Sequence, residues 1–120
     1  MRIAVATLPR LKADKLAEVN RAFDLASAVL TQGYPPAETM TWPAQMAEAL
    51  AWEADPDTPT PYLDGLALHR QMDPLEFRQR TLAKVNQFKQ ASQALVGHRQ
   101  HLEDLIDAAT TRQELDAIVW

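Results

Sequence analysis

The feature that most constrains this chain is a long stretch without an internal proline, which starts at Pro74 and continues to about Ala109. Its apolar residues recur at spacings of three and four, which places them along one face of a single helix. At about 1.5 Å per residue, such a helix is roughly 50 Å long. A compact domain of this size is only about 35 Å wide. We therefore expect either an elongated protein or a helix partly buried against a second copy or a partner.

The segment before Gly33 predicts the other long helix, from Leu11 to about Gln32. Its apolar residues are spaced three, four, three and four apart, as in a coiled-coil seam, and Leu25 and Val29 widen this stripe. Gly33 provides the left-handed residue that commonly follows a helix, and the prolines after Tyr34 prevent continuation. The seam residues are Leu16, Val19, Phe23, Ala26 and Leu30.

Three shorter helices are predicted, each preceded by a side chain that can accept a hydrogen bond from the first helical amides. A proline in the first turn supports the first two, because no amide donor is needed there. A glutamate three residues after the cap supports the last, and the same spacing from Asp73 to Glu76 starts the long helix. The caps and approximate ends are Thr41 and Ala54, Thr60 and the turn at Met72-Asp73, and Thr111 and Val119.

The first residues look different, because Ile3, Val5 and Thr7 alternate with alanines as in a short strand or extended arm. We expect an arm over residues 1–10 and a single helical domain over residues 11–120. The predicted fold is all-α: an elongated helical hairpin or bundle of two long and three short helices, with a short extended N-terminal arm.

Composition excludes several functions. The net charge is −4 and the sequence has no Lys/Arg-rich run, so we expect no nucleic-acid partner. Cysteine is absent, which removes disulfides, thiol catalysis and cysteine zinc sites. No apolar run approaches the ~20 residues of a membrane-spanning helix, so no membrane partner is expected.

Two histidines three residues apart, His98 and His101, could be offered as a metal site together with Asp104 or Asp107. This spacing arises often by chance, so surface or interface histidines are the simpler interpretation. The sequence contains only three glycines, which cannot build a phosphate-binding loop, and neither of its serines lies in a glycine-rich elbow. We therefore expect no enzyme activity, no metal and no cofactor.

Residues that could bind a protein partner lie at both ends of the chain. Tryptophan is enriched at interfaces, although Trp42, Trp52 and Trp120 are also interpretable as anchors of the core or its edge. A buried or interfacial Arg99, paired with Glu103 one turn later, is expected where the apolar stripe of the long helix is interrupted. The predicted partner-binding residues are Ile3, Val5, His98, Arg99, His101 and Trp120.

Several segments, in order, resemble small helical proteins encoded in phage and prophage tail gene clusters, of the tail-fibre assembly or tail accessory type. The resemblance covers roughly Leu11 to Val119. In that family a longer segment often precedes the first helix, whereas here only residues 1–10 do, which argues against a fibre-chaperone role if that segment grips the fibre. The matching pieces are Lys15–Ala22, Tyr34-Pro35, Thr41–Gln45, Glu48-Ala49, Ala51-Trp52, Ala54-Asp55, Thr60–Ala67, Gly97–Asp104, Thr110-Thr111 and Glu114-Leu115.

The resemblance implies a non-enzymatic phage or prophage protein that binds another tail or fibre component, as an assembly chaperone or a small accessory subunit. It also implies a location in the host cytoplasm during assembly, or in the virion if the protein is retained there. The helical seam and the long helix favour a dimer or trimer, and the sequence does not select between them. The alternative is a small phage-encoded helical modulator that binds a host protein.

Overall fold

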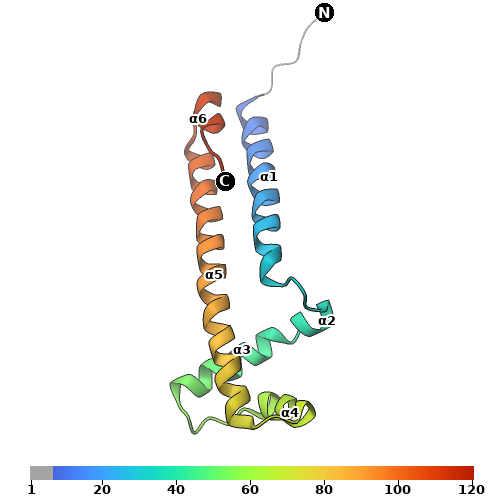
Figure 1. Ribbon diagram of the computed structural model, residues 1–120. Helices are drawn as coiled ribbons and strands as arrows, with labels where there is room; N and C mark the ends of the chain where they lie inside the picture. The colour runs from blue at the N-terminus through green and yellow to red at the C-terminus, as the bar shows by residue number, and fades with distance from the viewer. Residues whose placement is uncertain (1–6) are drawn as a thin grey trace, which may run out of the picture. The chain divides into compact units, whose positions relative to one another are not determined.

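The computed structural model describes residues 7–120, and within them the chain is all-α, as the sequence predicted (Figure 1). The two expected long helices are α1, with 20 residues, and α5, with 35 residues. The shorter expected helices are α3, α4 and α6. The single turn of α2 was not predicted. In order, the elements are α1 (Leu8–Ser27), the 3-10 helix η1 (Ala28–Leu30), α2 (Pro36–Thr39), α3 (Trp42–Ala54), α4 (Pro61–Arg70), α5 (Pro74–Ala108) and α6 (Arg112–Asp116).

The first helix starts earlier than predicted. Because α1 begins at Leu8, the arm expected over residues 1–10 is wrong for its last three residues, while residues 1–6 lie outside the described part of the chain. Thr7 is the extended residue before the helix, with φ −74° and ψ 158°. Pro9 falls in the first turn, where its missing amide hydrogen is not needed, and Leu8 packs against the core.

The end of this helix also differs from the prediction. The α-helical part stops at Ser27 rather than near Gln32, and η1 continues it. The Ser27 hydroxyl donates to the carbonyl oxygen of Phe23 at 2.8 Å, a local bond that competes with regular helix geometry. Gly33 has φ +85°, the left-handed conformation predicted for the residue that ends this region.

The chain divides by its internal contacts into two compact units, and each is described by itself. Unit 1 consists of the described residues up to Leu30 together with Ser92–Trp120, and unit 2 is Thr31–Ala91. The long helix α5 therefore contributes one part to each unit. The single domain expected over residues 11–120 stays a prediction, because a division by contacts does not show whether the units fold separately.

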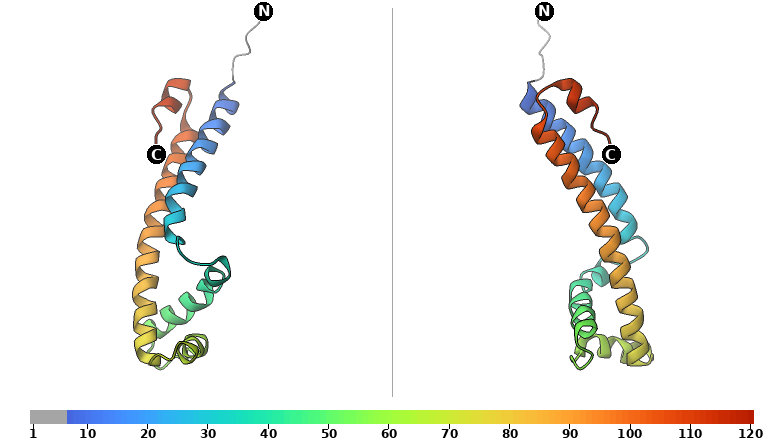
Figure 2. Two further views of the ribbon diagram at one scale, coloured as in Figure 1. Left: turned by 45° about the vertical axis from the view of Figure 1, so that its right-hand side comes forward. Right: turned by 90° about the vertical axis from the view of Figure 1, so that its left-hand side faces the viewer.

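Unit 1 is an antiparallel pair of helices with a cap. In Figures 1 and 2, α1 and the C-terminal part of α5 lie side by side, and α6 folds back at their shared end. Their apolar faces form one core, which includes the predicted seam residue Val19, and three further leucines of α1 pack against its edge. The buried residues of this core are Val19, Leu102, Ile106, Ala109, Leu115 and Ile118.

Unit 2 has its own core, formed where α3, α4 and the N-terminal part of α5 meet. Leu63 and Ala67 of α4 are fully buried there, together with Ala49 of α3. Phe77 and Val85 supply the buried apolar face of α5 in this unit. Each part of α5 thus buries its stripe against helices of its own unit.

Within residues 7–120, no helix is both long enough and apolar enough to cross a lipid bilayer.

Candidate interaction surface

Four of the six residues predicted to bind a partner lie in the described part of the chain, and Ile3 and Val5 lie outside it. All four belong to unit 1. His98, Arg99 and His101 are on α5, and Trp120 follows α6.

Trp120 reaches back from the end of α6 to both long helices of unit 1. Its ring meets the ring of His98 edge to face, with centroids 4.5 Å apart, and the ring of Phe23 at 6.2 Å. The His98 Nε2 atom lies 3.0 Å from the carbonyl oxygen of Trp120, a hydrogen bond in which Nε2 carries the proton. The Trp120 side chain remains 37% exposed. Trp120 is therefore a core-edge anchor that still presents part of its ring to solvent.

Arg99 is used inside unit 1. Its Nε atom donates to the Asn20 side-chain oxygen on α1 at 2.8 Å, and its guanidinium pairs with Glu103 at 2.8 Å. The predicted pair of Arg99 and Glu103 is confirmed. Because Arg99 already holds α1 against α5, it is occupied by the fold rather than presented to a partner.

The His101 side chain is exposed and makes no hydrogen bond or ion pair with another described residue. The arrangement offered as a metal site, His98 and His101 with Asp104 or Asp107, does not form. Among residues 7–120, no group of three or more histidine, aspartate or glutamate side chains is arranged to hold a metal ion. His98 faces Trp120 instead.

Two lysines of α1 donate hydrogen bonds to backbone carbonyl oxygens near the C-terminal end of unit 1. Lys12 Nζ donates to the carbonyl oxygen of Asp107 at 2.7 Å, at the end of α5. Lys15 Nζ donates to the carbonyl oxygen of Ile118 at 3.2 Å and pairs with Glu18 at 3.1 Å. Carbonyls near a helix end lack partners within the helix, so a lysine side chain can satisfy them. Nothing local in the sequence signals these bonds, because they join residues about a hundred positions apart.

An open groove of about 310 Å³ runs between α1 and α6 in unit 1. It carries three cationic and three anionic side chains and two leucines, so its lining is mixed rather than of one sign. From α1 the lining residues are Leu11, Asp14, Lys15, Glu18 and Arg21. From α6 they are Arg112, Leu115 and Asp116.

Two apolar side chains at the C-terminal end of unit 1's first helical segment are largely in water. Leu25 is 79% exposed and Val29 is 63% exposed. Both were expected at the edge of the apolar stripe of the first helix, but the buried part of that stripe does not reach them. They are four positions apart, so they lie on one face.

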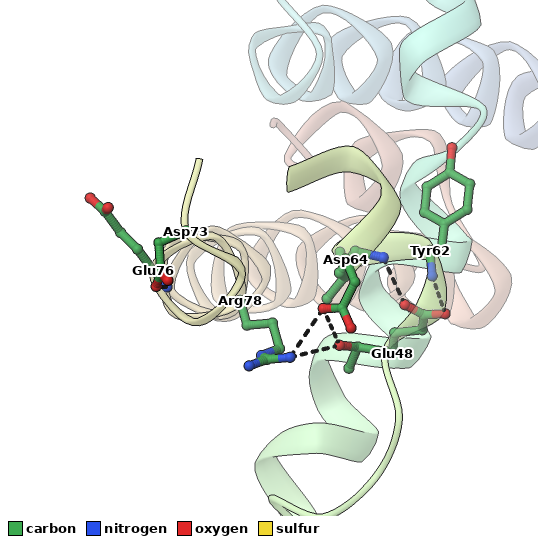
Figure 3. A network of polar contacts seen from close by, with 8 residues as sticks. Glu48, Tyr62, Asp64, Asp73, Glu76 and Arg78 are labelled. Atoms are coloured by element: carbon green, nitrogen blue, oxygen red, sulfur yellow. Dashed lines mark hydrogen bonds and ion pairs between the residues drawn. The ribbon is translucent and has the colours of Figure 1, made fainter. Parts of the chain in front are cut away.

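The densest polar network lies in unit 2 and is structural (Figure 3). The Glu48 carboxylate on α3 accepts the backbone N–H of Tyr62 at 3.0 Å and of Leu63 at 2.9 Å. It thereby satisfies two of the amides that have no partner at the start of α4. Nearby, Asp64 accepts from Arg78 at 3.0 Å. Both carboxylates, Glu48 and Asp64, are thus engaged in contacts that join α3, α4 and α5.

The remaining tryptophans are core-edge anchors of unit 2, as one of the two interpretations predicted. Trp42 is half-buried between Tyr34, at 5.0 Å between ring centroids, and Phe88, at 5.9 Å. Trp52 is half-buried under the guanidinium of Arg78, which lies 5.6 Å above its ring.

Comparison with known families gives one match. Residues 83–120 are similar to the HI1402 helical domain family. This segment comprises the C-terminal part of α5, α6 and the residues after it, and it contains every buried residue of the unit 1 core except Val19. No curated protein matches the chain, and no solved structure does.

Proposed function

We propose that this protein is a non-enzymatic phage or prophage protein that binds another tail component, as a tail-fibre assembly chaperone or a small tail accessory subunit. The proposal rests on the ordered resemblance to tail-cluster proteins and on one structural observation. That observation is the largely exposed apolar pair Leu25 and Val29 on one helix face of unit 1. Apolar groups gathered on one exposed face are characteristic of protein interaction sites.

The ionisable groups support a binding role over a catalytic one. In unit 2 the clustered side chains Glu48, Asp64 and Arg78 are engaged in bonds that hold helices together. In unit 1 Arg99 and Lys15 are likewise engaged with Asn20 and with the carbonyl oxygen of Ile118. A catalytic group needs a position facing the substrate, and these groups face the fold instead.

The proposal is tested by co-expression of the affinity-tagged chain with the tail and fibre proteins of a phage or prophage that carries its gene, followed by purification and mass spectrometry. We expect one tail component to copurify in a fixed ratio. Recovery of no tail component would contradict the proposal. Stoichiometric recovery of a host protein instead would favour the alternative, a modulator of a host target.

A matched control tests whether binding uses the exposed apolar face of unit 1. Leu68 of unit 2 is 74% exposed, much as Leu25 is. Leu68→Ser should leave copurification intact, because Leu68 lies in the other unit. Loss of the tail component with Leu68→Ser would show that binding uses unit 2 and would count against the face at Leu25 and Val29.

Self-association as a dimer or trimer is part of the proposal, as is a location in the host cytoplasm during assembly. Some residues of the α1 seam and the α5 stripe are buried within their own units and are not available to a symmetric interface. They are Val19 on α1, and Val85, Leu102 and Ile106 on α5. Light scattering on the pure protein measures this directly. A mass of twice or three times the 13.4 kDa chain is expected, and a monomer at all concentrations would contradict it.

A further inference from the structure

One face of α1 continues past the region that α6 covers. Leu11, Glu18 and Leu25 are spaced seven apart, and so are Ala22 and Val29. Residues seven apart return to nearly the same side of a helix, and a four-residue step stays on that side. These five residues therefore form one strip along α1 and the η1 turn that continues it, which we call the α1 strip.

The two ends of the α1 strip differ in what covers them. At the N-terminal end, Leu11 and Glu18 line the groove against α6, opposite Leu115. At the C-terminal end, Leu25 and Val29 are 79% and 63% exposed. In Figures 1 and 2, α6 folds back at the end of unit 1 where α1 begins. The N-terminal end of the α1 strip thus faces α6, whereas its C-terminal end is exposed.

Charge adds a second requirement at the boundary between the covered and bare parts. Arg21 lines the groove, is exposed and forms no ion pair with a described residue. The other cations of the groove have such partners: Lys15 pairs with Glu18 at 3.1 Å, and Arg112 lies 3.9 Å from Asp116. An occupant with a carboxylate beside its apolar residues would complement Arg21.

A second copy of this chain fits the α1 strip poorly. An antiparallel pairing that sets Leu11 on Leu25 of a second copy also sets Glu18 on the second copy's Glu18. A parallel pairing sets Arg21 on the second copy's Arg21. Like charges directly opposed disfavour both arrangements.

We propose that the α1 strip binds an amphipathic helix of a partner protein, whose apolar face covers Leu25 and Val29 and whose flanking carboxylate pairs with Arg21. The inference rests on the proposed function, since it names the surface and the partner chemistry through which this protein would bind. Helix-in-groove recognition uses apolar anchors at spacings of three and four, which match the pair on α1. The partner helix would add to unit 1 beyond α6, along the same side.

The test uses a designed helical peptide as the probe, because its charge can be reversed without changing its apolar face. One version carries leucines at helical spacing with a flanking glutamate, and the other has lysine in place of that glutamate. Each is titrated into ¹⁵N-labelled full-length protein while amide shifts and affinity are recorded. We expect the glutamate peptide to shift amides from Arg21 to Val29 and to bind more tightly than the lysine peptide.

Three variants make the result specific. The double variant Leu25→Ser/Val29→Ser should weaken binding of the glutamate peptide at least about tenfold, because it removes the apolar anchors. Arg21→Glu should reverse the preference between the peptides, by roughly two- to fivefold in each direction, the range of exposed ion pairs. Leu68→Ser, in unit 2, should change nothing. Circular dichroism establishes that each variant remains helical.

The proposal is overturned if the shifts map to another surface, if Leu25→Ser/Val29→Ser binds as tightly as the wild type, or if Arg21→Glu leaves the peptide preference unchanged. A concentration-dependent dimer that the same double variant abolishes would also overturn it, by showing that a second copy covers the α1 strip.

The two proposals fail in different ways. If the peptide binds as expected and no tail component copurifies, the proposed function fails while the surface stands. If a tail component copurifies equally well with Leu25→Ser/Val29→Ser, the surface is wrong while the proposed function stands.

Discussion

The side-chain hydrogen bonds of the polar network in unit 2 join residues about 15 positions apart, whereas those of unit 1 join the two ends of the described chain. In unit 2, Glu48 caps α4 from 14 and 15 positions away, and Asp64 and Arg78 are 14 apart. In unit 1, the bonds that join α1 to α5 and to the C-terminal segment span 79 to 103 positions. Closing such long loops costs more chain entropy than closing the shorter loops of unit 2.

The units also differ in what they leave uncovered. The most exposed apolar side chains of unit 2 are Met40, which follows α2, and Leu68 of α4. Tyr34, Tyr62 and Leu75 are exposed to a smaller extent. Scattered single apolar side chains are ordinary on a protein surface. Unit 1 exposes Leu25 and Val29 on one helix face, next to Arg21. Unit 2 therefore leaves its most exposed apolar side chains on different segments, whereas unit 1 retains two of them four positions apart and beside Arg21, at the face that we propose for a partner.

The largest effect is expected from deleting a buried side chain in either core. Ile106→Ala in unit 1 and Leu63→Ala in unit 2 remove fully buried aliphatic groups and should each lower the free energy of unfolding by about 2–5 kcal/mol. Amide hydrogen exchange should show the greatest loss of protection in α1 and α6 for Ile106→Ala, and in α3 and α4 for Leu63→Ala. An identical exchange pattern for both variants would remove the distinction between the units.

A smaller loss is expected when the local cap of unit 2 is removed. Glu48→Ala leaves the Tyr62 and Leu63 amides without their acceptor and should cost about 1–3 kcal/mol in chemical denaturation. Glu53→Ala is the matched control, because Glu53 is an exposed glutamate of the same helix with only a 3.4 Å contact to Asn86. It should change stability by less than about 0.5 kcal/mol. Equal losses for the two variants would show that capping by Glu48 contributes nothing.

In unit 1 the corresponding polar contact is Asn20 with Arg99. Asn20→Ala should cost about 0.5–1.5 kcal/mol, the usual net contribution of one hydrogen bond. The loss should be absent in an Arg99→Met background, since the donor is then gone. A double-mutant cycle measures this coupling, and a value near zero would mean that the bond does not hold α1 to α5.

The smallest effect is a gain at the turn between α4 and α5. Gln71 has φ +57°, a left-handed conformation that glycine adopts without a steric penalty. Gln71→Gly should raise the free energy of unfolding by about 0.5–1 kcal/mol. Gln79→Gly, at an exposed position inside α5, should lower it by about 1 kcal/mol. If both substitutions destabilise the protein, the conformation of Gln71 is not a source of strain.

Local chemistry made much of the fold predictable. The long helix was expected from Pro74 to about Ala109 and is found from Pro74 to Ala108, because a capping aspartate and a regular apolar spacing define it. The Glu76 amide donates to that aspartate, Asp73, at 3.0 Å. Thr111 likewise accepts from the Glu114 amide at 3.1 Å, as its spacing predicted. The pair of Arg99 and Glu103 is one turn apart and was found for the same reason.

Two predicted helix caps were wrong because another element competes for the same groups. Thr41 was expected to cap α3, but its hydroxyl donates at 2.6 Å to the carbonyl oxygen of Glu38 at the end of the missed turn α2. Thr60 was expected to cap α4, but Glu48 takes that role from α3 while the Thr60 hydroxyl donates to Asp64 at 2.9 Å. Local spacing in the sequence cannot predict a capping carboxylate that comes from a different helix.

The candidate site was less predictable than the fold. His98 and Trp120 were selected separately, and the structure brings their rings together. Arg99 was selected as well, but it is engaged with α1. The α1 strip was missed, because the apolar spacing assigned Leu25 and Val29 to the buried stripe and only packing shows where α6 and the core stop.

The most direct test of the account is a single amide shift map of the full-length protein with the glutamate-bearing helical peptide. We predict that amide shifts will change mainly between Arg21 and Val29 in unit 1, and that the amides around Met40 and Leu68 in unit 2 will be unchanged. Shifts of similar size around Met40 and Leu68 would contradict it, because unit 2 would then be as open to a partner helix as unit 1.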